Sequence, residues 1–220
     1  MSEPVKARRR YESPRRREAA AATRRAIIDA ARRRFEADGY SATSIAAIAA
    51  DAGVSAATIY VAFETKGNLL RAVWHLQLRG DRDEVPVAEQ PWYREVMDAP
   101  DAATQVHLNA RNSRRVKERI GRLIEAIRGA AAVDAEAAEL WARIEQDFHA
   151  NQRDIVESIA AKGALAPHLD VETAADIMWT LNHPSVHRLL VGRGWSPERY
   201  ERWLEDAFRT QILGLPAHRG

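Results

Sequence analysis

Hydrophobic residues recur along this chain at the three- and four-residue spacing of amphipathic helices, and nowhere do they alternate as in a strand. The first such stretch runs from about residue 16 to residue 38. Gly39 follows it and favours a left-handed helix end. The inner positions of this stretch are Thr23, Ile27, Ala30, Ala31 and Phe35. The pattern predicts an all-α fold.

Three shorter helices are expected directly after the first. The spacing places them over residues 45–52, 56–63 and 66–79. A cluster of hydroxyl residues at 41–44 can cap the first of them, and Gly53 ends it. Ser55 and Thr65 can cap the other two. Two helices joined by a short turn that contains glycine form the helix-turn-helix pattern, which is typical of DNA-binding proteins.

The second helix of this pattern lies in the stretch GVSAATIYVAF, residues 53–63, which carries no charge. If Ile59 points to the core, Phe63 lies beside it, because residues four apart share a helix face. Ala57, Tyr60 and Val61 then point outward or lie at the border. A small neutral face can enter a major groove, where alanine and valine meet thymine methyl groups and tyrosine donates to a phosphate. We therefore expect this helix to contact DNA.

The rest of the chain predicts a further helical body. Helical spacing places its elements over residues 92–98, 101–129, 134–163, 171–182 and 197–213. Asp101, Asp134, Asp170 and Ser196 can cap the last four of these. Pro184 is expected to interrupt the chain between the last two. In the long second helix of this body, the early stretch VHLNARNSRR is far more polar than the regular hydrophobic pattern that follows it.

Charge is divided between the two parts of the chain. Residues 1–80 hold 15 Lys or Arg against 8 Asp or Glu, whereas residues 81–220 hold 18 against 23. A basic head on an acidic body indicates a polyanionic partner for the head. We expect three units: a disordered basic arm over residues 1–14, a helix-turn-helix domain over 15–80, and a helical body over 81–220. The arm either reaches toward DNA or is an idle solvated tail.

Composition excludes several other classes of protein. The chain has no cysteine, which removes disulfides, thiol catalysis and cysteine-ligated zinc. No hydrophobic run is long enough to span a membrane, and the Arg-rich N-terminus does not resemble a secretory signal, so a cytoplasmic location is expected. His183 and His187 have a metal-binding spacing, but Pro184 disturbs their helix and no paired carboxylate is evident. We expect no metal, no cofactor and no enzymatic activity, because no phosphate loop or nucleophile motif is present.

Residues 24–74 resemble the DNA-binding domain of the tetracycline-repressor (TetR) family of bacterial regulators. The matching features are Ile27, Ala31, Phe35, Gly39-Tyr40, Thr43-Ser44, Ile48-Ala49, Ala52-Gly53-Val54-Ser55, Thr58-Ile59-Tyr60, Phe63, Lys66 and Leu69-Leu70. The resemblance implies that Thr43, Ser44, Tyr60 and Lys66 contact phosphates. Helix capping by Thr43, simple packing of Tyr60 and a solvated surface position for Lys66 stay open as alternatives. The resemblance also implies that Ser55, Ala57 and Thr58 lie near bases, and Val61 is on the same outward face. One departure is Ala62, where many members have a histidine.

In this family the body binds a small-molecule effector and forms the dimer. The resemblance assigns dimerisation to residues 171–182 and 197–213, although intramolecular core explains their hydrophobic stripes equally well. A symmetric dimer would read a near-palindromic operator.

We expect the effector pocket to be lined by aromatic and polar side chains of the central helices of the body. The candidates are Trp92, His107, Arg111, Trp141, Ile144, Phe148, His149 and Trp179, with core packing open for Trp141 and Phe148 and a surface role open for His107.

The sequence therefore predicts a DNA-binding transcriptional regulator, a homodimeric repressor that a small molecule releases from double-stranded operator DNA. An activator of the same fold, or a DNA-binding protein without an effector, is the alternative. The effector must bind the two conformations unequally, because otherwise it shifts no equilibrium.

Overall fold

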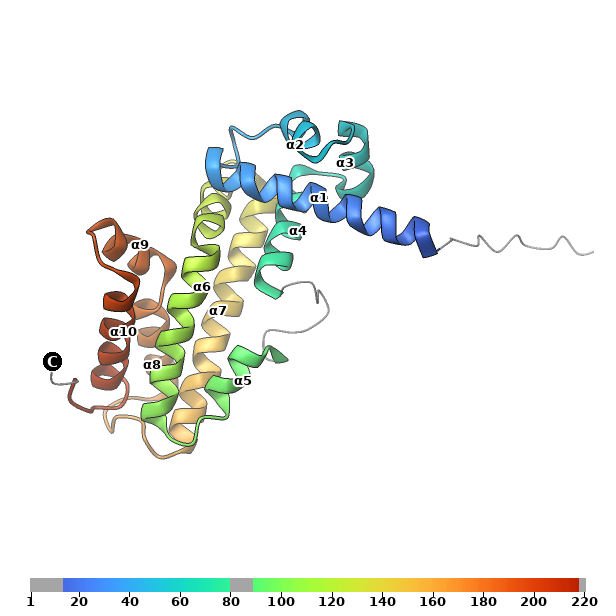
Figure 1. Ribbon diagram of the computed structural model, residues 1–220. Coiled ribbons are helices and arrows are strands. Elements are labelled where there is room, and N and C mark those ends of the chain that lie inside the picture. Colours follow the sequence, from blue (N-terminus) through green and yellow to red (C-terminus); the bar gives the residue numbers. More distant parts are fainter. Residues whose placement is uncertain (1–13, 80–88, 218–220) are drawn as a thin grey trace, which may run out of the picture.

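The computed structural model describes residues 14–79 and 89–217, and within these residues it contains ten α-helices and no strand (Figure 1). The all-α prediction is confirmed. The helices of the N-terminal part are α1 (Pro14–Asp38), α2 (Ile45–Ala52), α3 (Ala56–Phe63) and α4 (Lys66–Arg79). Those of the body are α5 (Pro91–Met97), α6 (Ala102–Ala130), α7 (Ala135–Ala161), α8 (Val171–Leu181), α9 (Pro184–Gly192) and α10 (Pro197–Gln211). The expected arm over residues 1–14 lies outside the described residues, except for Pro14.

The long helices α6 and α7 run side by side along the body, and the other helices pack around them (Figure 1). Helices α8, α9 and α10 cover one side of this pair, and α4 and α5 lie on the other. Helices α1, α2 and α3 form the head at one end of the molecule. Because α4 contacts α1 as well as α6 and α7, it links the head to the body.

Capping side chains set the predicted helix starts. Six N-cap residues each accept a hydrogen bond from the backbone N–H three residues on, which satisfies one of the free donors of a first helical turn. They are Ser44, Ser55, Asp101, Asp134, Asp170 and Ser196. The Thr65 hydroxyl serves α4 in the same way, accepting from the amide of Asn68 at 3.0 Å. The helix boundaries expected from the sequence are confirmed to within about two residues.

Helix α9 was not expected, because the sequence analysis took Pro184 as an interruption. Pro184 is instead the first residue of the helix, and the His183 side chain caps it by accepting from the Ser185 amide at 3.2 Å. Proline is favoured at a first helical position, because the N–H that it lacks has no partner there in any case. Histidine is an unusual cap, so Pro184 was the signal for this helix start, and the sequence analysis took it for an interruption.

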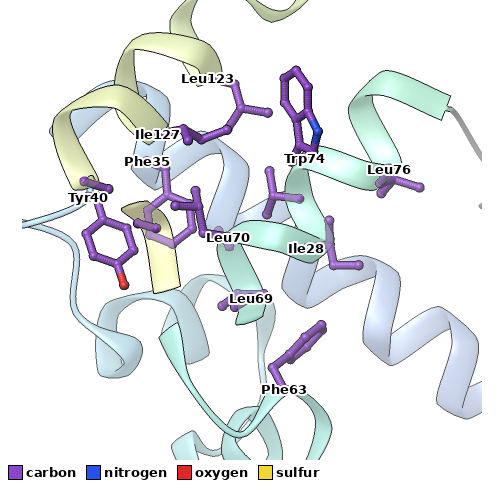
Figure 2. Packing of buried hydrophobic residues seen from close by; sticks show 14 of the residues in the cluster. Ile28, Phe35, Tyr40, Phe63, Leu69, Leu70, Trp74, Leu76, Leu123 and Ile127 are labelled. Carbon is purple, nitrogen blue, oxygen red and sulfur yellow. The ribbon is translucent and has the colours of Figure 1, made fainter. Parts of the chain in front are cut away.

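One hydrophobic core runs from the head into the body without a break. Phe35 and Leu70 of the head are buried in one cluster with Leu123 and Ile127 of α6 (Figure 2). Such a shared core makes the packing of the head depend on the position of α6.

Polar contacts and one tight approach join α7 to the same end of the head. The Tyr40 hydroxyl donates to Asp134 at 2.7 Å, and the Thr65 hydroxyl donates to Glu136. A Cβ atom on Gly67 would lie 2.6 Å from the Cβ of Glu136, so a glycine is needed where α4 meets α7. The first turn of α7 is thereby fixed against both the α1–α2 turn and the start of α4.

A second core fills the other end of the body. Met178 of α8 and Tyr200, Leu204 and Phe208 of α10 are fully buried in it. The sequence left open whether the hydrophobic stripes of α8 and α10 form a dimer interface or pack within the chain. The structure shows that their central residues pack within the chain. Ile177 and Trp203 remain partly exposed at its edge.

Candidate nucleic-acid interface

Helices α2 and α3 meet at a bend of 104°. Gly53 makes this turn possible with φ 67°, a left-handed backbone conformation that glycine adopts without steric cost. The Val54 amide then donates to the carbonyl of Ala49 at 3.0 Å, which closes the end of α2. The local sequence thus dictates a helix-turn-helix in which α3 crosses the end of α2.

One face of helix α3 packs into the core of the head, and the opposite face is exposed to solvent. Its inner side chains Ile59 and Phe63 are 1 % and 5 % exposed, and they anchor the helix in the head core. On the opposite side Ala57 is exposed, and Tyr60 and Val61 are 53 % and 87 % exposed. Large apolar side chains held this far in solvent on a rigid helix are suited to contact with a partner.

Ser55 and Thr58 lie together at the start of α3. The Ser55 hydroxyl oxygen accepts from the Thr58 amide at 3.1 Å and lies 2.9 Å from the Thr58 hydroxyl. These bonds fix the orientation of both side chains before any partner arrives. A preformed pair of hydroxyls loses less conformational entropy when it binds.

The structure places Thr43, for which the resemblance implied a phosphate contact, inside the turn between α1 and α2. This side chain is 3 % exposed, and its hydroxyl donates to the carbonyl of Gly39 at 2.7 Å. Its role is to hold the turn between α1 and α2. Ser44 is exposed and caps α2, so of the two hydroxyls only Ser44 faces solvent.

Lys66 is half-buried at the first position of α4. Its ammonium donates to the carbonyl of Tyr40 and lies 4.1 Å from the centroid of the Tyr40 ring. Burial lowers the pKa of Lys66 from its usual value, and the nearby Asp134 carboxylate partly opposes that shift. The lysine therefore stabilises the α1–α2 turn whether or not it also meets a phosphate.

Two arginines of α1 hold α2 and α3 in place, and the sequence analysis did not single them out. The guanidinium of Arg24 lies 4.3 Å from the centroid of the Phe63 ring and donates to the carbonyl of Ala62 at 3.2 Å. Arg34 donates to both oxygens of Asp51, at 2.6 and 2.9 Å, and holds the pKa of that carboxyl below its usual range. Arg24 thus places an exposed cation beside the end of α3.

The turn after α3 is strained at Glu64. This residue has φ 65° and ψ −53°, and among the described residues no other non-glycine has a positive φ. The Thr65 amide donates to the carbonyl of Phe63 at 2.7 Å, which makes the turn a three-residue γ-turn of the rare, strained kind. The strain fixes where α4 starts relative to α3.

Replacing Glu64 by glycine is expected to raise the free energy of unfolding by up to about 1 kcal/mol, because relief of the strain exceeds the entropy cost of a glycine. Urea unfolding measures this change. Glu64→Ala is the matched control, since it removes the same carboxylate and keeps the strained backbone, and it should give no gain. A Glu64→Gly protein no more stable than Glu64→Ala contradicts the assignment of strain.

Residues 27–73 match the sequence profile of bacterial regulatory proteins of the tetR family. The chain carries a TetR-family DNA-binding domain. No curated protein matches it. The matched segment contains α2 and α3 together with the turns on either side of them. The resemblance expected from the sequence is confirmed.

Solved structures share the fold over most of the chain. A protein from Saccharomonospora viridis, described as a transcriptional regulator in complex with choline, is 18% identical with a TM-score of 0.69, covering 88% of this chain and 98% of its own. NalD of Pseudomonas aeruginosa, the secondary repressor of the MexAB-OprM multidrug efflux pump, is 22% identical with a TM-score of 0.69, over 89% and 98%. A TetR-family protein from Rhodococcus sp. is 19% identical with a TM-score of 0.66, over 87% and 99%. This chain therefore has the fold of TetR-family transcriptional regulators.

In the part of the chain that the structure places, no single helix has the length and apolar character needed to cross a membrane. The bent pair α2 and α3 meets these criteria when its two helices are counted together, by length and composition alone. In the TetR-family domain this pair is the helix-turn-helix. Within the same residues no cluster of three or more His, Asp or Glu side chains could hold a metal ion.

The body of the chain contains a cavity of about 740 Å³ between α4, α5, α6 and α7. Of the candidates for an effector pocket, Trp92, Ile144 and Phe148 line it. The volume is in the range of sites for drug-sized ligands. The cavity is therefore large enough for a small-molecule effector.

The other five pocket candidates do not line this cavity. His107 pairs with Glu205 at 2.9 Å, Arg111 pairs with Glu95, and His149 pairs with Asp176 at 2.8 Å. Trp141 packs against the first core, and Trp179 lies between the rings of His149 and His183. These five residues therefore lie outside the lining of this cavity.

Sequence reasoning missed the polar wall of the cavity. It consists of Asn109, Asn112 and Lys117 of α6, Gln152 of α7 and Asn182 at the end of α8. A signal was present in the polar stretch over residues 106–115. Its buried members Asn109, Asn112 and Ser113 recur at helical spacing, in the same register as Lys117.

His187 of α9 lies close to this wall, with its ring 4.7 Å from that of Tyr200. Burial, together with the positive charge of Lys117, lowers the pKa of His187 to about 4.

In the unfolded chain, the imidazole of His187 binds a proton at higher pH than it does in the folded protein. This histidine should therefore contribute stability in full above its unfolded pKa of about 6.5, and that contribution should fall as pH falls toward 4. His187→Phe should flatten the pH dependence of unfolding free energy in this window. An unchanged slope contradicts the shift, and His168→Phe serves as a matched control at an exposed position.

Proposed function

We propose that this chain is a homodimeric transcriptional repressor, which binds a near-palindromic operator through α3 and is released by a small molecule in the cavity of the body. The observation that carries the proposal is the exposed, uncharged face of Ala57, Tyr60 and Val61 on a helix anchored from behind. The described part of the head around it carries 11 Lys or Arg against 6 Asp or Glu. Such a surface is drawn to the phosphates by its charge, and its neutral face can then enter the groove.

In this proposal each exposed residue has a distinct role on the DNA. The groove-facing residues are Ser55, Ala57, Thr58 and Val61, and the phosphate-facing ones are Ser44, Tyr60, Lys66 and Arg24. Lys66 uses one N–H donor for Tyr40, which leaves two for a phosphate. The basic residues of the arm over 1–14 add to the attraction without reading sequence. We keep 15–80 as the head and 81–220 as the body, although their cores join.

The dimer is proposed to form through the outer faces of α8 and α10. Their central hydrophobic residues are committed to the core, but Ile177 and Trp203 stay partly exposed. Leu189 and Val191 of the neighbouring α9 are 60 % and 40 % exposed. A two-fold arrangement through this side would place the two α3 helices about one turn of DNA apart, on the order of 35 Å.

The position of the cavity supports release by a ligand. Arg71 and Trp74 of α4 line one side, and α6 and α7 line the other, so an occupant touches both the helix that leads into the head and the body. A ligand that fits one position of α4 better than another shifts the equilibrium between them. Two proteins of the same fold were crystallised with small molecules, the Saccharomonospora protein with choline and SmeT with triclosan.

Selection of binding sites from random double-stranded DNA tests the proposal. A repeated half-site with two-fold symmetry and about one turn of spacing is expected, together with a protein-to-DNA ratio of two per site. Absence of any preferred sequence would defeat the DNA-binding proposal. A preferred site without two-fold symmetry would contradict the symmetric dimer and leave sequence-specific DNA binding standing. A reporter gene behind the selected site then separates repressor from activator.

A further inference from the structure

Lys117 is a buried lysine at the wall of the cavity. It lies in the middle of α6, lines the cavity and is 6 % exposed. Its ammonium donates to the side-chain oxygen of Asn182 and to the hydroxyl of Tyr200 at 2.9 Å. Two of its three N–H donors are thereby used, and both acceptors are neutral groups.

Within the residues that the structure describes, no carboxylate forms an ion pair with Lys117. Buried lysines are rare unless an acid is paired with them, because an isolated charge loses its hydration. The acidic side chains that line the cavity belong to α7, where Glu145 pairs with His183 at 3.1 Å and Glu139 and Asp147 are exposed. Burial lowers the pKa of Lys117 well below its usual value, because nothing offsets the lost hydration.

A chain of amides keeps this arrangement in place. The side-chain nitrogen of Asn182 donates to Gln152 at 3.2 Å, and the nitrogen of Asn109 donates to the same oxygen at 3.4 Å. With its nitrogen engaged in this way, Asn182 presents its oxygen to Lys117. The cationic end of the cavity is therefore fixed before a ligand enters.

The remainder of the cavity has apolar walls, with Arg71 and Arg143 also in its lining. Trp74 of α4, Trp92 of α5, Phe148 of α7 and Ile120 and Ile124 of α6 line it. Such walls favour a flat or branched hydrophobic body over a polar one such as a sugar. A buried lysine without an acidic partner, set among these apolar walls, describes the site of an amphipathic ligand.

We propose that the effector is an amphipathic organic acid, whose carboxylate lies against the ammonium of Lys117 and whose apolar body fills the space between Trp74, Trp92 and Phe148. The proposal rests on the proposed function, because it names the ligand class for the same cavity. A carboxylate supplies the negative charge that the wall lacks and favours the charged form of the lysine, which burial alone disfavours. Cationic molecules of similar size are disfavoured, because they would bring a second positive charge close to the buried ammonium of Lys117.

The test uses pairs of ligands that differ only in charge. 1-Naphthylacetate, 4-phenylbutyrate and decanoate are compared with their primary amides, by calorimetric titration and by quenching of tryptophan fluorescence in the full-length protein. We expect at least one acid to bind roughly 10- to 100-fold more tightly than its amide. Equal affinity of each acid and its amide overturns the proposal, and so does absence of binding by all three acids.

Lys117→Met keeps the length of the side chain and removes its charge. It should abolish the preference for the acid while leaving the affinity for the amide unchanged. Lys162→Met is the matched control, because Lys162 is an exposed lysine whose ammonium also donates to a neutral side chain, Gln105, at 2.6 Å, away from the cavity. An acid affinity that survives Lys117→Met overturns the proposal.

A mutation-free measurement covers the case in which Lys117→Met does not fold. In wild-type protein with labelled lysine, the NMR signal of the Lys117 side chain should move when an acid is added and stay in place when the amide is added. A signal that is unmoved by a bound acid overturns the proposal. Failure of the proposed function is distinguishable, because neutral molecules that release the selected operator would leave the repressor proposal standing while the acid proposal falls.

Discussion

Val61→Glu should abolish sequence-specific DNA binding and leave the folded protein as stable as the parent. Val61 is 87 % exposed on the outward face of α3, so its replacement removes little buried surface. A carboxylate at this place would be carried into the groove between two rows of phosphates. Like charges brought together at an interface cost several kcal/mol, so a loss of affinity of at least about 100-fold is expected. Titration of the selected operator, followed by fluorescence anisotropy, measures it.

Val133→Glu is the matched control for this substitution. Val133 is also a valine in solvent, 68 % exposed, and it lies in the turn between α6 and α7, outside α3. It adds the same charge to the chain, so it corrects for the change in overall attraction to DNA. If both variants lose affinity equally, the effect is one of net charge and α3 is not the reading helix. Thermal melting of both should match that of the parent.

Local chemistry made the helix boundaries predictable. Ser55 caps α3 and Asp101 caps α6 through bonds that span three residues, and the left-handed turn at Gly53 needs only the absence of a Cβ atom. These interactions are decided within one turn of helix, so they can be read from the sequence. The same is true of the inner face of α3, because Ile59 and Phe63 are four residues apart.

Interactions between distant segments were not predictable in this way. The resemblance implied that Thr43 contacts a phosphate, yet its hydroxyl donates to the carbonyl of Gly39 inside the α1–α2 turn. Lys66 was expected to contact a phosphate from the start of α4, and nothing local signalled that the ring and carbonyl of Tyr40, 26 residues earlier, hold its ammonium. Which of several polar or aromatic stripes faces a cavity depends on how α6 and α7 are rotated against α4. That rotation is set by packing and has no local signal.

The head and the body share a core, although the sequence analysis placed a domain boundary between them at residue 80. Buried side chains of α1, α4, α6 and α7 form one cluster across it. Beside this cluster, the Tyr40–Asp134 hydrogen bond and the close approach of Gly67 to Glu136 are further contacts between the head and α7. An effector that moves α4 or α7 would therefore displace the head as a rigid unit, since a packed core transmits small shifts without yielding.

Ile127→Ala tests whether the head and the body fold as one unit. Ile127 belongs to α6 in the body, is fully buried, and lies beside Phe35 and Leu123 (Figure 2). Truncating a buried isoleucine leaves a cavity and costs about 3 kcal/mol in unfolding free energy. Because the cluster spans both parts, the loss should appear as a shift of one cooperative transition. Urea unfolding followed by circular dichroism and by tryptophan fluorescence measures the shift with two independent probes.

Ile155→Ala provides the comparison from the second core, which contains no head residue. If the two cores are one cooperative unit, both variants move a single transition, and the two probes coincide for each. If instead Ile127→Ala separates the curves while Ile155→Ala does not, the head unfolds on its own and the shared cluster couples the parts only weakly. In that case a ligand in the cavity could affect DNA binding only by destabilising the head, because the ligand could not move the head as a rigid body. Coincident curves support the opposite mechanism, in which the occupied cavity reorients an intact head against the operator.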